Sequence, residues 1–437
     1  MPQIYSGRQQ DQLFNAIGNR LVRRSNALED DYTGDIHPEV RRVINEMHAA
    51  GLLSGLRYIA GPDGYGVSGP NRINRVREIV PGSGEATQGT AADQPELSRT
   101  DDRMNLALNS LFSGTGDPTG WSSSLNTDLV PGADGHQNLT FFDAVNVTQD
   151  VPLLAGQRLV FAVRIEVKGG SVSEVVDIVD VNKTVLESYR AMQPATAGEW
   201  LWVAVEMTAG GSAKFQITGA DFEELSRPVC LYLPANWAEL SASEKQQYLT
   251  DHYAASGPDH LEFPGFNGMR GITNPGASNQ WLDKPGLPFS TWDAMTWLCF
   301  FVPHVGDSGT RRIFHQGVNQ IGIHRIGSTG FRFGFRDSEN NIINHDLLGA
   351  IEPLNQPVFL VASAKAGGQV QLYSNGELGL TSSAPASFGD GSDSEPLTLL
   401  SRSGTNYPIT MFWAGVLNTF LDPSEVSTLN SILRGEP

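Results

Sequence analysis

A repeated alternation of apolar and other side chains constrains the fold of this chain more than any other feature. From Leu159 to Val167, apolar residues occupy every second position, and the turn-forming pair Gly169 and Gly170 follows. A period of two places one set of side chains on each face of a β-strand. Because no helical pattern intervenes between such runs, they predict an antiparallel sandwich rather than alternating strands and helices. The same pattern recurs in three further segments, 173–181, 200–207 and 215–218.

A second β region follows in the C-terminal part of the chain. Phe331, Phe333 and Phe335 alternate with arginine and glycine residues, which predicts a half-buried strand. Further on, the pair Asn375 and Gly376 separates two apolar runs. Both residues of a type I′ turn need a positive φ, which Asn and Gly adopt most readily, so the pair predicts a tight hairpin.

Composition supports a folded, mainly β protein. The 437 residues are 40% hydrophobic, which is enough for sizeable cores, and 47 glycines and 25 prolines fit many short strands with tight turns. Only 18% of the residues are charged, and the formal net charge is −18. Because an acidic chain repels phosphate backbones, we expect no nucleic-acid partner.

Two amphipathic helices are expected before the β regions. Leu13, Ile17 and Leu21 form an apolar stripe within 8–24. A second helix is expected to begin at Pro38 and to end near Gly51. Such short helices bury their stripes against each other or against another chain.

Other segments of the chain complete the expected domain organisation. Residues 61–100 are rich in Gly, Pro, Ser and Thr, which predicts a linker or extended arm, with a short helix at 101–111 after it. Ser241 with Glu244 predicts a capping box, and Asp422 predicts the cap of a terminal helix. The expected parts are a helical anchor (1–60), a linker with a short helix (61–113), a first β-sandwich (114–232), a helical connector (233–257) and a second jelly roll (258–437).

The cysteines and the hydropathy pattern bear on disulfide bonds, metal sites and membrane association. Cys230 and Cys299 lie far apart in apolar runs and are expected to be buried thiols. The chain shows no Cys/His cluster at metal-site spacing. Its N-terminus lacks the pattern of a secretory signal, and its longest apolar run, near 295–302, is far short of the ~20 residues that span a bilayer. We therefore expect no membrane partner.

Several segments resemble a known family. The order DHLEFPGFNG, TWLCFFVP, IFHQGVNQIGI and GFRFGFRD, followed by the LYSNGEL hairpin, FWAGVLNTFL and the DPSEV helix, resembles laminin-G-like, concanavalin-A-type jelly rolls in virion proteins of tailed bacteriophages. This resemblance covers about 258–435. GEWLWVAVEM and AKFQITGADFEEL resemble the jelly-roll carbohydrate-binding modules of glycosidases. The N-terminal helical pair resembles leaders that precede such domains in phage structural proteins.

The resemblance implies a fold class and a function. The fold is expected to be mainly β, with two antiparallel jelly-roll sandwiches preceded by a short helical N-terminal anchor and an extended linker. The implied function is that of a non-enzymatic virion structural protein, such as a head or tail fibre, spike or decoration protein. It would be made in the host bacterial cytoplasm, would bind other virion proteins through residues 1–100 as an oligomer, and would bind host surface polysaccharide. A polysaccharide depolymerase on the same scaffold and a secreted bacterial adhesin are the alternatives.

Three side-chain groups are candidates for catalysis, and each has a structural interpretation. The sequence Gly306-Asp307-Ser308-Gly309 resembles a protease nucleophile motif, but it lacks partner signatures and fits a tight turn. Glu174, Asp177 and Asp180 are spaced by three, so a regular strand would put Asp177 on the opposite face from the other two. The third group is expected to be structural and comprises His315, His324 and His345 with Asp346.

Six residues are candidates for carbohydrate binding. Trp200 and Trp202 share one strand face, and if the aliphatic face is the core they form an exposed platform; the alternative is cover by the linker or a neighbouring domain. Loop residues at one rim of the second sandwich can supply hydrogen bonds to sugar hydroxyls. The candidates there are Asn340, Asn341, Asp390 and Asp393. No cofactor and no metal site is expected, with calcium in the loop of Asp390, Asp393 and Glu395 as the alternative.

Overall fold

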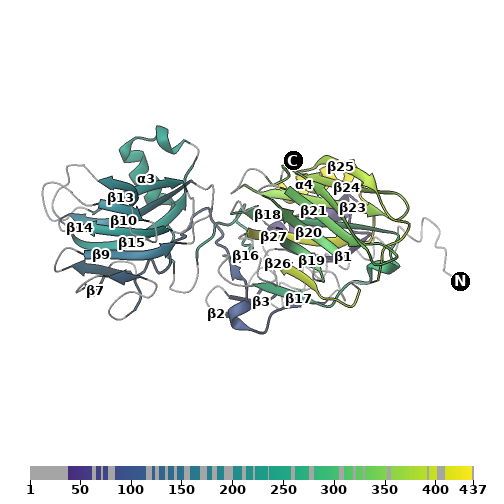
Figure 1. Ribbon diagram of the computed structural model, residues 1–437, viewed down its shortest axis with the longest axis horizontal. Helices are drawn as coiled ribbons and strands as arrows, with labels where there is room; N and C mark the ends of the chain where they lie inside the picture. The colour runs from purple at the N-terminus through teal and green to yellow at the C-terminus, as the bar shows by residue number, and fades with distance from the viewer. Residues whose placement is uncertain are drawn as a thin grey trace. The chain divides into compact units, whose positions relative to one another are not determined.

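The chain folds into two compact units, which we describe separately. In this computed structural model the larger unit comprises Met1–Ser98 and Phe266–Pro437, and the smaller comprises Arg99–Gly265 (Figure 1). The structure describes residues 38–435 apart from 62–64, 70–71, 77–83, 115–120, 124–126, 133–135, 142–144, 152–157, 168–174, 180–184, 191–199, 209–212, 220–221, 235, 257–260, 275–279, 305–309, 318–320, 328–329, 352–355, 391–392 and 401–408. The expected helix at 8–24, the 306–309 motif, Glu174 and Asp180 lie outside the described residues, as does the side chain of Asp177.

The larger unit is an antiparallel β-sandwich with two layers. The first layer has the strand order β25 (Glu377–Ser383), β24 (Gln369–Ser374), β23 (Val358–Lys365), β18 (Ala294–Pro303) and β27 (Ile409–Leu417), with β1 (Leu56–Ala60) and β16 (Ile272–Asn274) both paired to the far side of β27. The second layer has the order β22 (Ile342–Leu347), β21 (Gly330–Arg336), β20 (Ile321–Ile326), β19 (Arg311–Gln316), β26 (Leu397–Leu400) and β17 (Trp281–Lys284).

The two layers enclose the main core of this unit. On β18, Trp297 and Cys299 belong to the cluster between the layers, whereas Leu298 and Phe300 belong to a second cluster on the outer face. Both faces of this strand are therefore buried. That explains why its sequence is continuously apolar instead of alternating with polar residues.

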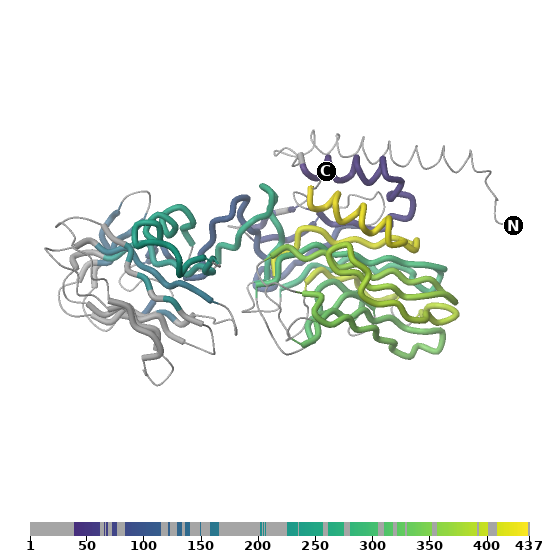
Figure 2. The backbone as a smooth tube through the Cα atoms, turned by 90° about the horizontal axis from the view of Figure 1, so that it is seen from above, coloured from purple at the N-terminus to yellow at the C-terminus, as the bar shows by residue number. Residues whose placement is uncertain are grey.

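Two helices cover the outer face of the first layer. α2 (Pro38–Ala49) and α4 (Pro423–Arg434) lie side by side over it, as Figure 2 shows. Asp422 caps α4 by accepting hydrogen bonds from the backbone N–H groups of Ser424 and Glu425, and Gly435 ends the helix at φ 70°. The expected cap of this helix at Asp422 and the expected start of α2 at Pro38 are confirmed.

The expected anchor and linker are wrong for the described residues before 99. α2 contributes Val43, Ile44 and Met47 to the core under the helices. Residues 65–97 form strands of the larger unit, because their short apolar and β-branched runs find sheet partners that their Gly and Pro content concealed. These strands are β2 (Tyr65–Gly69), β3 (Arg72–Val76), β4 (Ala86–Thr87) and β5 (Glu96–Leu97), with the 3₁₀ helix η1 (Ala91–Asp93) between β4 and β5.

The hairpin between β24 and β25 confirms the turn expected from the sequence. Asn375 and Gly376 have φ angles of 52° and 86°, as a type I′ turn requires. The side-chain oxygen of Asn375 also accepts hydrogen bonds from the backbone N–H of Phe359 at 3.0 Å and from the guanidinium of Arg434 at 2.7 Å.

The smaller unit is a second antiparallel sandwich, as expected. One sheet has the order β13 (Trp200–Thr208), β10 (Arg158–Val167), β15 (Phe222–Tyr232), β8 (Gln137–Phe141) and β7 (Thr127–Pro131). The other has the order β12 (Val185–Arg190), β11 (Val175–Val179), β14 (Ala213–Gly219), β9 (Val145–Val151) and β6 (Ser122–Ser123).

The expected helical connector at 233–257 is instead an integral part of the smaller unit. The 3₁₀ helix η3 (Trp237–Glu239) and α3 (Ala242–His252) pack onto its core, and the capping box of Ser241 and Glu244 is present. The expected helix at 101–111 is also wrong. Asn105 is fully buried there and forms a bridge with Glu262, and its side chain bonds three backbone groups of other segments, so extended backbone is favoured over a helical turn.

Both cysteines are free, fully buried thiols, which confirms the expectation. Burial raises the pKa of each thiol well above its ordinary value. Among the helices that the structure describes, none has the length and apolar character needed to cross a bilayer.

Candidate functional site

The turn between β21 and β22 presents a group of exposed polar side chains. The carboxylate of Asp337 accepts hydrogen bonds of 2.9 Å from the backbone N–H groups of Glu339 and Asn341. These bonds, first of all the one from Asn341, hold the pKa of Asp337 below its ordinary value. An Asx turn of this kind orders a loop without help from the core.

A second loop, between β25 and β26, packs directly against this turn. Phe388 is 4% exposed and meets Phe335 edge to face, with ring centroids 5.7 Å apart, so the loop is anchored in the core. The N–H of Gly389 donates to the carbonyl oxygen of Arg336 at 2.9 Å. A Cβ atom on Gly389 would lie 2.1 Å from the carbonyl oxygen of Asp337, so only glycine permits this approach.

The two loops meet through side chains that remain exposed. The side-chain amide of Asn340 donates to the carboxylate of Asp390 at 3.1 Å, and that of Asn341 donates to Asp337 at 3.2 Å and to Glu339 at 3.3 Å. We call Asp337, Glu339, Asn340, Asn341 and Asp390 the rim cluster. The next residue along the chain, Ile342, is 46% exposed and places an apolar surface beside these polar groups.

The structure therefore brings together three of the four rim residues expected from the sequence, but not the fourth. The carboxylate of Asp393 accepts hydrogen bonds from the backbone N–H of Ser290 at 3.3 Å and from its hydroxyl. Ser290 lies in the 3₁₀ helix η4 (Phe289–Thr291). Asp393 thus ties the loop to η4 rather than joining the rim cluster.

The expected exposed platform on β13 is wrong for Trp202. This indole is only 6% exposed because α3 covers it. Its Nε1 donates to the hydroxyl of Thr250 at 3.1 Å, and the side chain of Gln246 bonds both the backbone N–H and the carbonyl of Trp202. Cover by a neighbouring segment, the alternative left open above, describes Trp202. The side chain of Trp200 lies outside the described residues.

The two loop carboxylates considered for calcium, those of Asp390 and Asp393, have separate hydrogen-bond partners. Asp390 is bonded to Asn340 and Asp393 to Ser290, so the two carboxylates are directed to different partners. Calcium requires six to eight oxygen ligands around one point. Within the residues that the structure describes, no group of three or more His, Cys, Asp or Glu side chains is placed to hold a metal.

The histidines of the second layer have structural surroundings. His315 is 1% exposed, and its Nδ1 lies 3.1 Å from the carbonyl oxygen of Gly317. Burial, reinforced by the neighbouring charges of Arg312 and Arg332, lowers the pKa of His324 to about 3, so this ring is neutral at pH 7. His345 accepts or donates a 2.6 Å hydrogen bond with Ser382 on β25.

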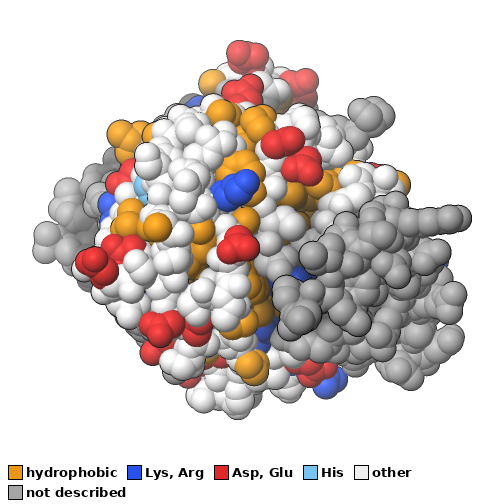
Figure 3. All heavy atoms as spheres, turned by 90° about the vertical axis from the view of Figure 1, so that its right-hand side faces the viewer, with side chains coloured by type: hydrophobic (Ala, Val, Ile, Leu, Met, Phe, Trp, Pro, Cys, Tyr) orange, Lys and Arg blue, Asp and Glu red, His pale blue; other side chains and the backbone are white. Residues whose placement is uncertain are grey.

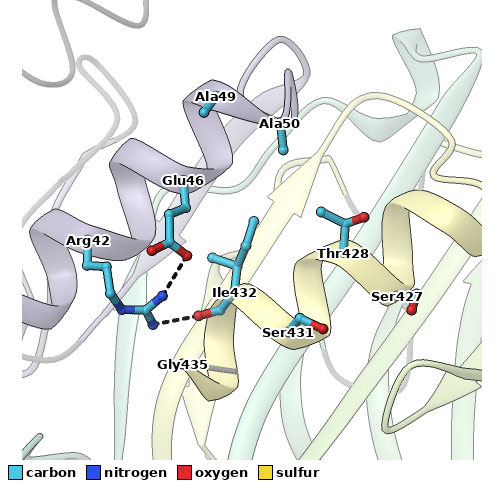
Figure 4. A pocket seen from close by; sticks show the side chains of 9 residues that line it. All are labelled: Arg42, Glu46, Ala49, Ala50, Ser427, Thr428, Ser431, Ile432 and Gly435. Atoms are coloured by element: carbon cyan, nitrogen blue, oxygen red, sulfur yellow. Dashed lines mark hydrogen bonds and ion pairs between the residues drawn. The ribbon is translucent and has the colours of Figure 1, made fainter. Parts of the chain in front are cut away.

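A shallow hollow lies between α2 and α4 (Figure 4). It measures about 650 Å³ and has a charged group at one end, where Arg42 bonds Glu46 and the carbonyl oxygen of Ile432, each at 2.6 Å. Because Arg42 already forms hydrogen bonds with groups of the same two helices, we interpret the hollow as part of the packing between α2 and α4. The lining residues are Arg42, Glu46, Ala49, Ala50, Ser427, Thr428, Ser431, Ile432 and Gly435.

Sequence reasoning overlooked three contributors to the rim. These contributors are Asp337, Glu339 and Gly389. The Asx-turn pattern of Asp337 with Asn341 was a readable signal for the first two. The role of Gly389 depends on an approach between loops about 50 residues apart, for which a local pattern carries no signal.

Comparisons with known proteins give limited overlap. No protein-family model and no curated protein matches the chain. Among solved structures, the chain is similar to the botulinum neurotoxin serotype G binding domain (13% identity, 38% of this chain, 43% of that chain, TM-score 0.32) and to the binding domain of Paraclostridial Mosquitocidal Protein 1 (15%, 39%, 47%, 0.33). A receptor-binding domain of a mosaic serotype C/D botulinum neurotoxin overlaps less (11%, 32%, 36%, 0.27). The chain thus spans less than half of each of these structures. These matches assign no family.

Proposed function

We propose that this protein is a non-enzymatic binding component of a tailed-phage virion, which attaches to host surface polysaccharide through the rim cluster of its larger unit. The observation that carries the binding part is the meeting of two ordered loops at Asn340 and Asp390. Their amides and carboxylates are exposed, whereas the backbone beneath them is held by core contacts. Recognition groups on loops carried by a rigid sheet are typical of binding sites.

The chemistry of the rim suits sugar hydroxyls. Carboxylate oxygens accept and amide groups both donate and accept, so the rim cluster offers the directed bonds that a polyol requires. Ile342, 46% exposed, supplies an apolar contact for the CH face of a sugar ring. Because the loops are ordered before binding, little conformational entropy is lost when a ligand arrives.

The charge states of the carboxyl groups favour binding over hydrolysis. A glycosidase needs one carboxylic acid with a raised pKa to protonate the leaving group. Where the pKa of a described carboxyl group departs clearly from its ordinary value, the departure is downward. These groups are Asp101, Glu244, Asp337, Asp346 and Asp422.

The virion part of the proposal rests on the resemblance of 258–435 to jelly rolls of phage virion proteins. Within residues 1–100, α2 and strands β1 to β5 are part of the larger unit. The contact with other virion proteins is therefore proposed for residues 1–37. Deletion of 1–37 is expected to leave the folded units intact but to abolish incorporation into particles. Particles that still incorporate the shortened protein would contradict the anchoring claim.

A glycan array of diverse bacterial polysaccharides tests the binding claim. The full chain is expected to bind at least one glycan, and Asp390→Ala is expected to lose most of that signal. Release of reducing sugar from the bound glycan would identify a depolymerase instead. Absence of binding to every polysaccharide would assign the sandwich to particle architecture alone.

A further inference from the structure

β22 forms an edge of the second layer of the larger unit. It pairs with β21 in an unbroken antiparallel register, and among the described residues no strand pairs with its other side. The backbone N–H and C=O groups on that side are a template for a further strand. Proteins usually block such an edge with lysine, proline or a bulge, and β22 contains none of these. The edge is therefore open to strand addition.

Two apolar side chains at the ends of this edge are exposed. Ile342, the first residue of β22, is 46% exposed, and Leu348, directly after the last residue, is 77% exposed. They are two of the four large hydrophobic residues that are exposed in the described part of the chain. Exposed and half-buried residues alternate along β22, so Asn344 and Asp346 share the outer face with these two. Exposed apolar groups along an open edge indicate an interaction surface.

The inner face of β22 is held by the edge strand of the other layer. The ring of His345 shares a 2.6 Å hydrogen bond with the hydroxyl of Ser382 on β25 and stacks on Phe335, with ring centroids 5.4 Å apart. Leu347 fills the space over Gly379, where a Cβ atom would lie 2.5 Å from the leucine side chain. β22 is therefore ordered before a partner arrives, so pairing costs little conformational entropy.

The charges of this edge are paired, unlike much of the surface. The chain has a net charge of −18, and acidic side chains are scattered over the face seen in Figure 3, so two copies repel each other at most orientations. On β22, the carboxylate of Asp346 accepts hydrogen bonds of 2.7 and 2.8 Å from the guanidinium of Arg332 on β21. Burial lowers the pKa of His345, so its ring is neutral at pH 7. A second copy therefore meets no net charge along this strand.

The sequence of β22 is complementary to itself in one register. Two copies related by a two-fold axis pair antiparallel, and an axis at His345 places Ile342 opposite Leu348. The same axis places Asn344 opposite Asp346. An exposed apolar residue then meets an exposed apolar residue, and an amide that donates meets a carboxylate that accepts, each twice.

The neighbouring registers lack this complementarity. An axis at Asp346 sets two like charges directly opposite each other, which destabilises a strand pair. An axis at Asn344 sets Ile342 opposite Asp346. An axis between two residues pairs the outer face of one copy with the inner face of the other. The axis at His345 is therefore the register that the side chains favour.

We propose that β22 is a self-association surface, on which a second copy of this chain adds its own β22 antiparallel about a two-fold axis at His345. The pairing joins the second layers of the two copies into one continuous sheet, and it covers Ile342 and Leu348 of each copy. Ile342 also borders the rim cluster, so Leu348, at the far end of the strand, is the residue to vary. The proposal goes beyond the glycan-binding function and does not depend on it.

Sedimentation velocity of the full chain at increasing concentration tests the proposal. We expect the wild type to form a dimer and Leu348→Lys to stay monomeric, because lysine at a strand edge opposes strand addition. Leu348 is 77% exposed, so lysine there leaves the fold intact. Val67→Lys replaces a 54% exposed apolar residue on β2, and this matched control should dimerise as the wild type does. A wild type that stays monomeric, or a dimer that persists in Leu348→Lys, would overturn the proposal.

Disulfide cross-linking tests the register. The double variant Ile342→Cys/Leu348→Cys sets thiols opposite each other at two places, within the separation that a disulfide spans, so mild oxidation should give a covalent dimer. Each single variant sets its thiol opposite an aliphatic side chain and should cross-link little. The native thiols of Cys230 and Cys299 are fully buried and leave the readout clear. Equal cross-linking in single and double variants would contradict the axis at His345.

Failure of this proposal and failure of the glycan site are distinguishable. Leu348 and the rim lie at opposite ends of the six-residue strand β22, so Leu348→Lys should keep the affinity for a short glycan and lose only the avidity of two linked sites. Asn340→Gly should lose glycan binding and still dimerise. If the wild type dimerises through β22 but binds no glycan, the rim proposal fails and this one stands. If it binds glycan as a monomer, the reverse holds.

Discussion

The side-chain amide of Asn340 donates a 3.1 Å hydrogen bond to the carboxylate of Asp390, which lies 50 residues further along the chain. This bond joins the β21–β22 turn to the loop that precedes β26. Asn340 is held at φ 62°, where asparagine is tolerated better than most residues. The bond and the positive φ angle together explain why an asparagine occupies position 340 and a carboxylate occupies position 390.

Gly389→Ala should disrupt the rim. The added Cβ would lie 2.1 Å from the carbonyl oxygen of Asp337 and 2.7 Å from the side-chain oxygen of Asn340, so one of the loops must move. We expect loss of glycan binding together with a destabilisation of about 1–3 kcal/mol, the usual cost of overpacking. Urea denaturation and the array measure both effects. Gly367→Ala is a poor control because its φ is positive, whereas Gly89→Ala meets open space at an ordinary φ and should change neither property.

Trp202→Ala should act on stability rather than on glycan affinity. The indole is 6% exposed and hydrogen-bonded to Thr250, so its removal leaves a cavity under α3. Phe or Trp truncations of this kind cost about 3–5 kcal/mol. Chemical denaturation followed by circular dichroism checks this. A variant that keeps wild-type stability but loses glycan binding would contradict this prediction and would indicate that Trp202 contacts the glycan.

The caps and the burial of Trp202 show which features of the fold a single sequence predicts and which it does not. Period-two patterns located both sandwiches, and local signals located the turn at Asn375 and the caps at Ser241 and Asp422, because these depend on residues near in sequence. The cover over Trp202 depends on α3, 40 or more residues away, so the exposed and the covered interpretations fit the same strand equally well. Strands β2 to β5 lie in a segment rich in Gly and Pro, and the sequence does not predict them because β4 and β5 pair with strands far along the chain.

Substitution of Asn375 tests the hairpin. Asn375→Ala should destabilise the larger unit by about 1–3 kcal/mol, because alanine disfavours φ 52° and cannot accept the bonds from Phe359 and Arg434. Asn375→Gly keeps the backbone conformation and should cost less than Asn375→Ala. Thermal unfolding of the two variants compares them. Equal losses would show that the side-chain bonds alone matter and the φ angle does not.

Protonation of His324 should weaken the larger unit in acid. Its folded pKa of about 3 lies below the ordinary value of 6.5, so the unfolded chain binds the proton more readily. The stability contributed by the neutral ring is complete above about pH 6.5 and falls as the pH drops from there towards 3, by at most about 1.4 kcal/mol per pH unit for one proton. Urea titrations between pH 4 and 7 should show this slope, and His324→Phe should flatten it. An unchanged slope in that variant would assign the acid sensitivity to other groups.

The buried thiols should be unreactive in the folded protein. Cys230 and Cys299 are fully buried, and burial raises the pKa of both, so neither provides accessible thiolate near pH 8. An aromatic disulfide reagent should release little chromophore from the native chain and two equivalents after denaturation. Rapid reaction of one thiol without denaturant would show that its unit opens locally.

Calorimetric titration of a glycan selected on the array into wild type, Asn340→Gly and Asn236→Ala tests the central claim most directly. Asn340→Gly removes the rim amide while tolerating φ 62°, and Asn236→Ala removes an exposed amide in the smaller unit whose side chain caps no helix. The account predicts at least a tenfold loss of affinity for Asn340→Gly and wild-type affinity for Asn236→Ala. Wild-type affinity in Asn340→Gly would contradict the assignment of the rim as the glycan-binding site.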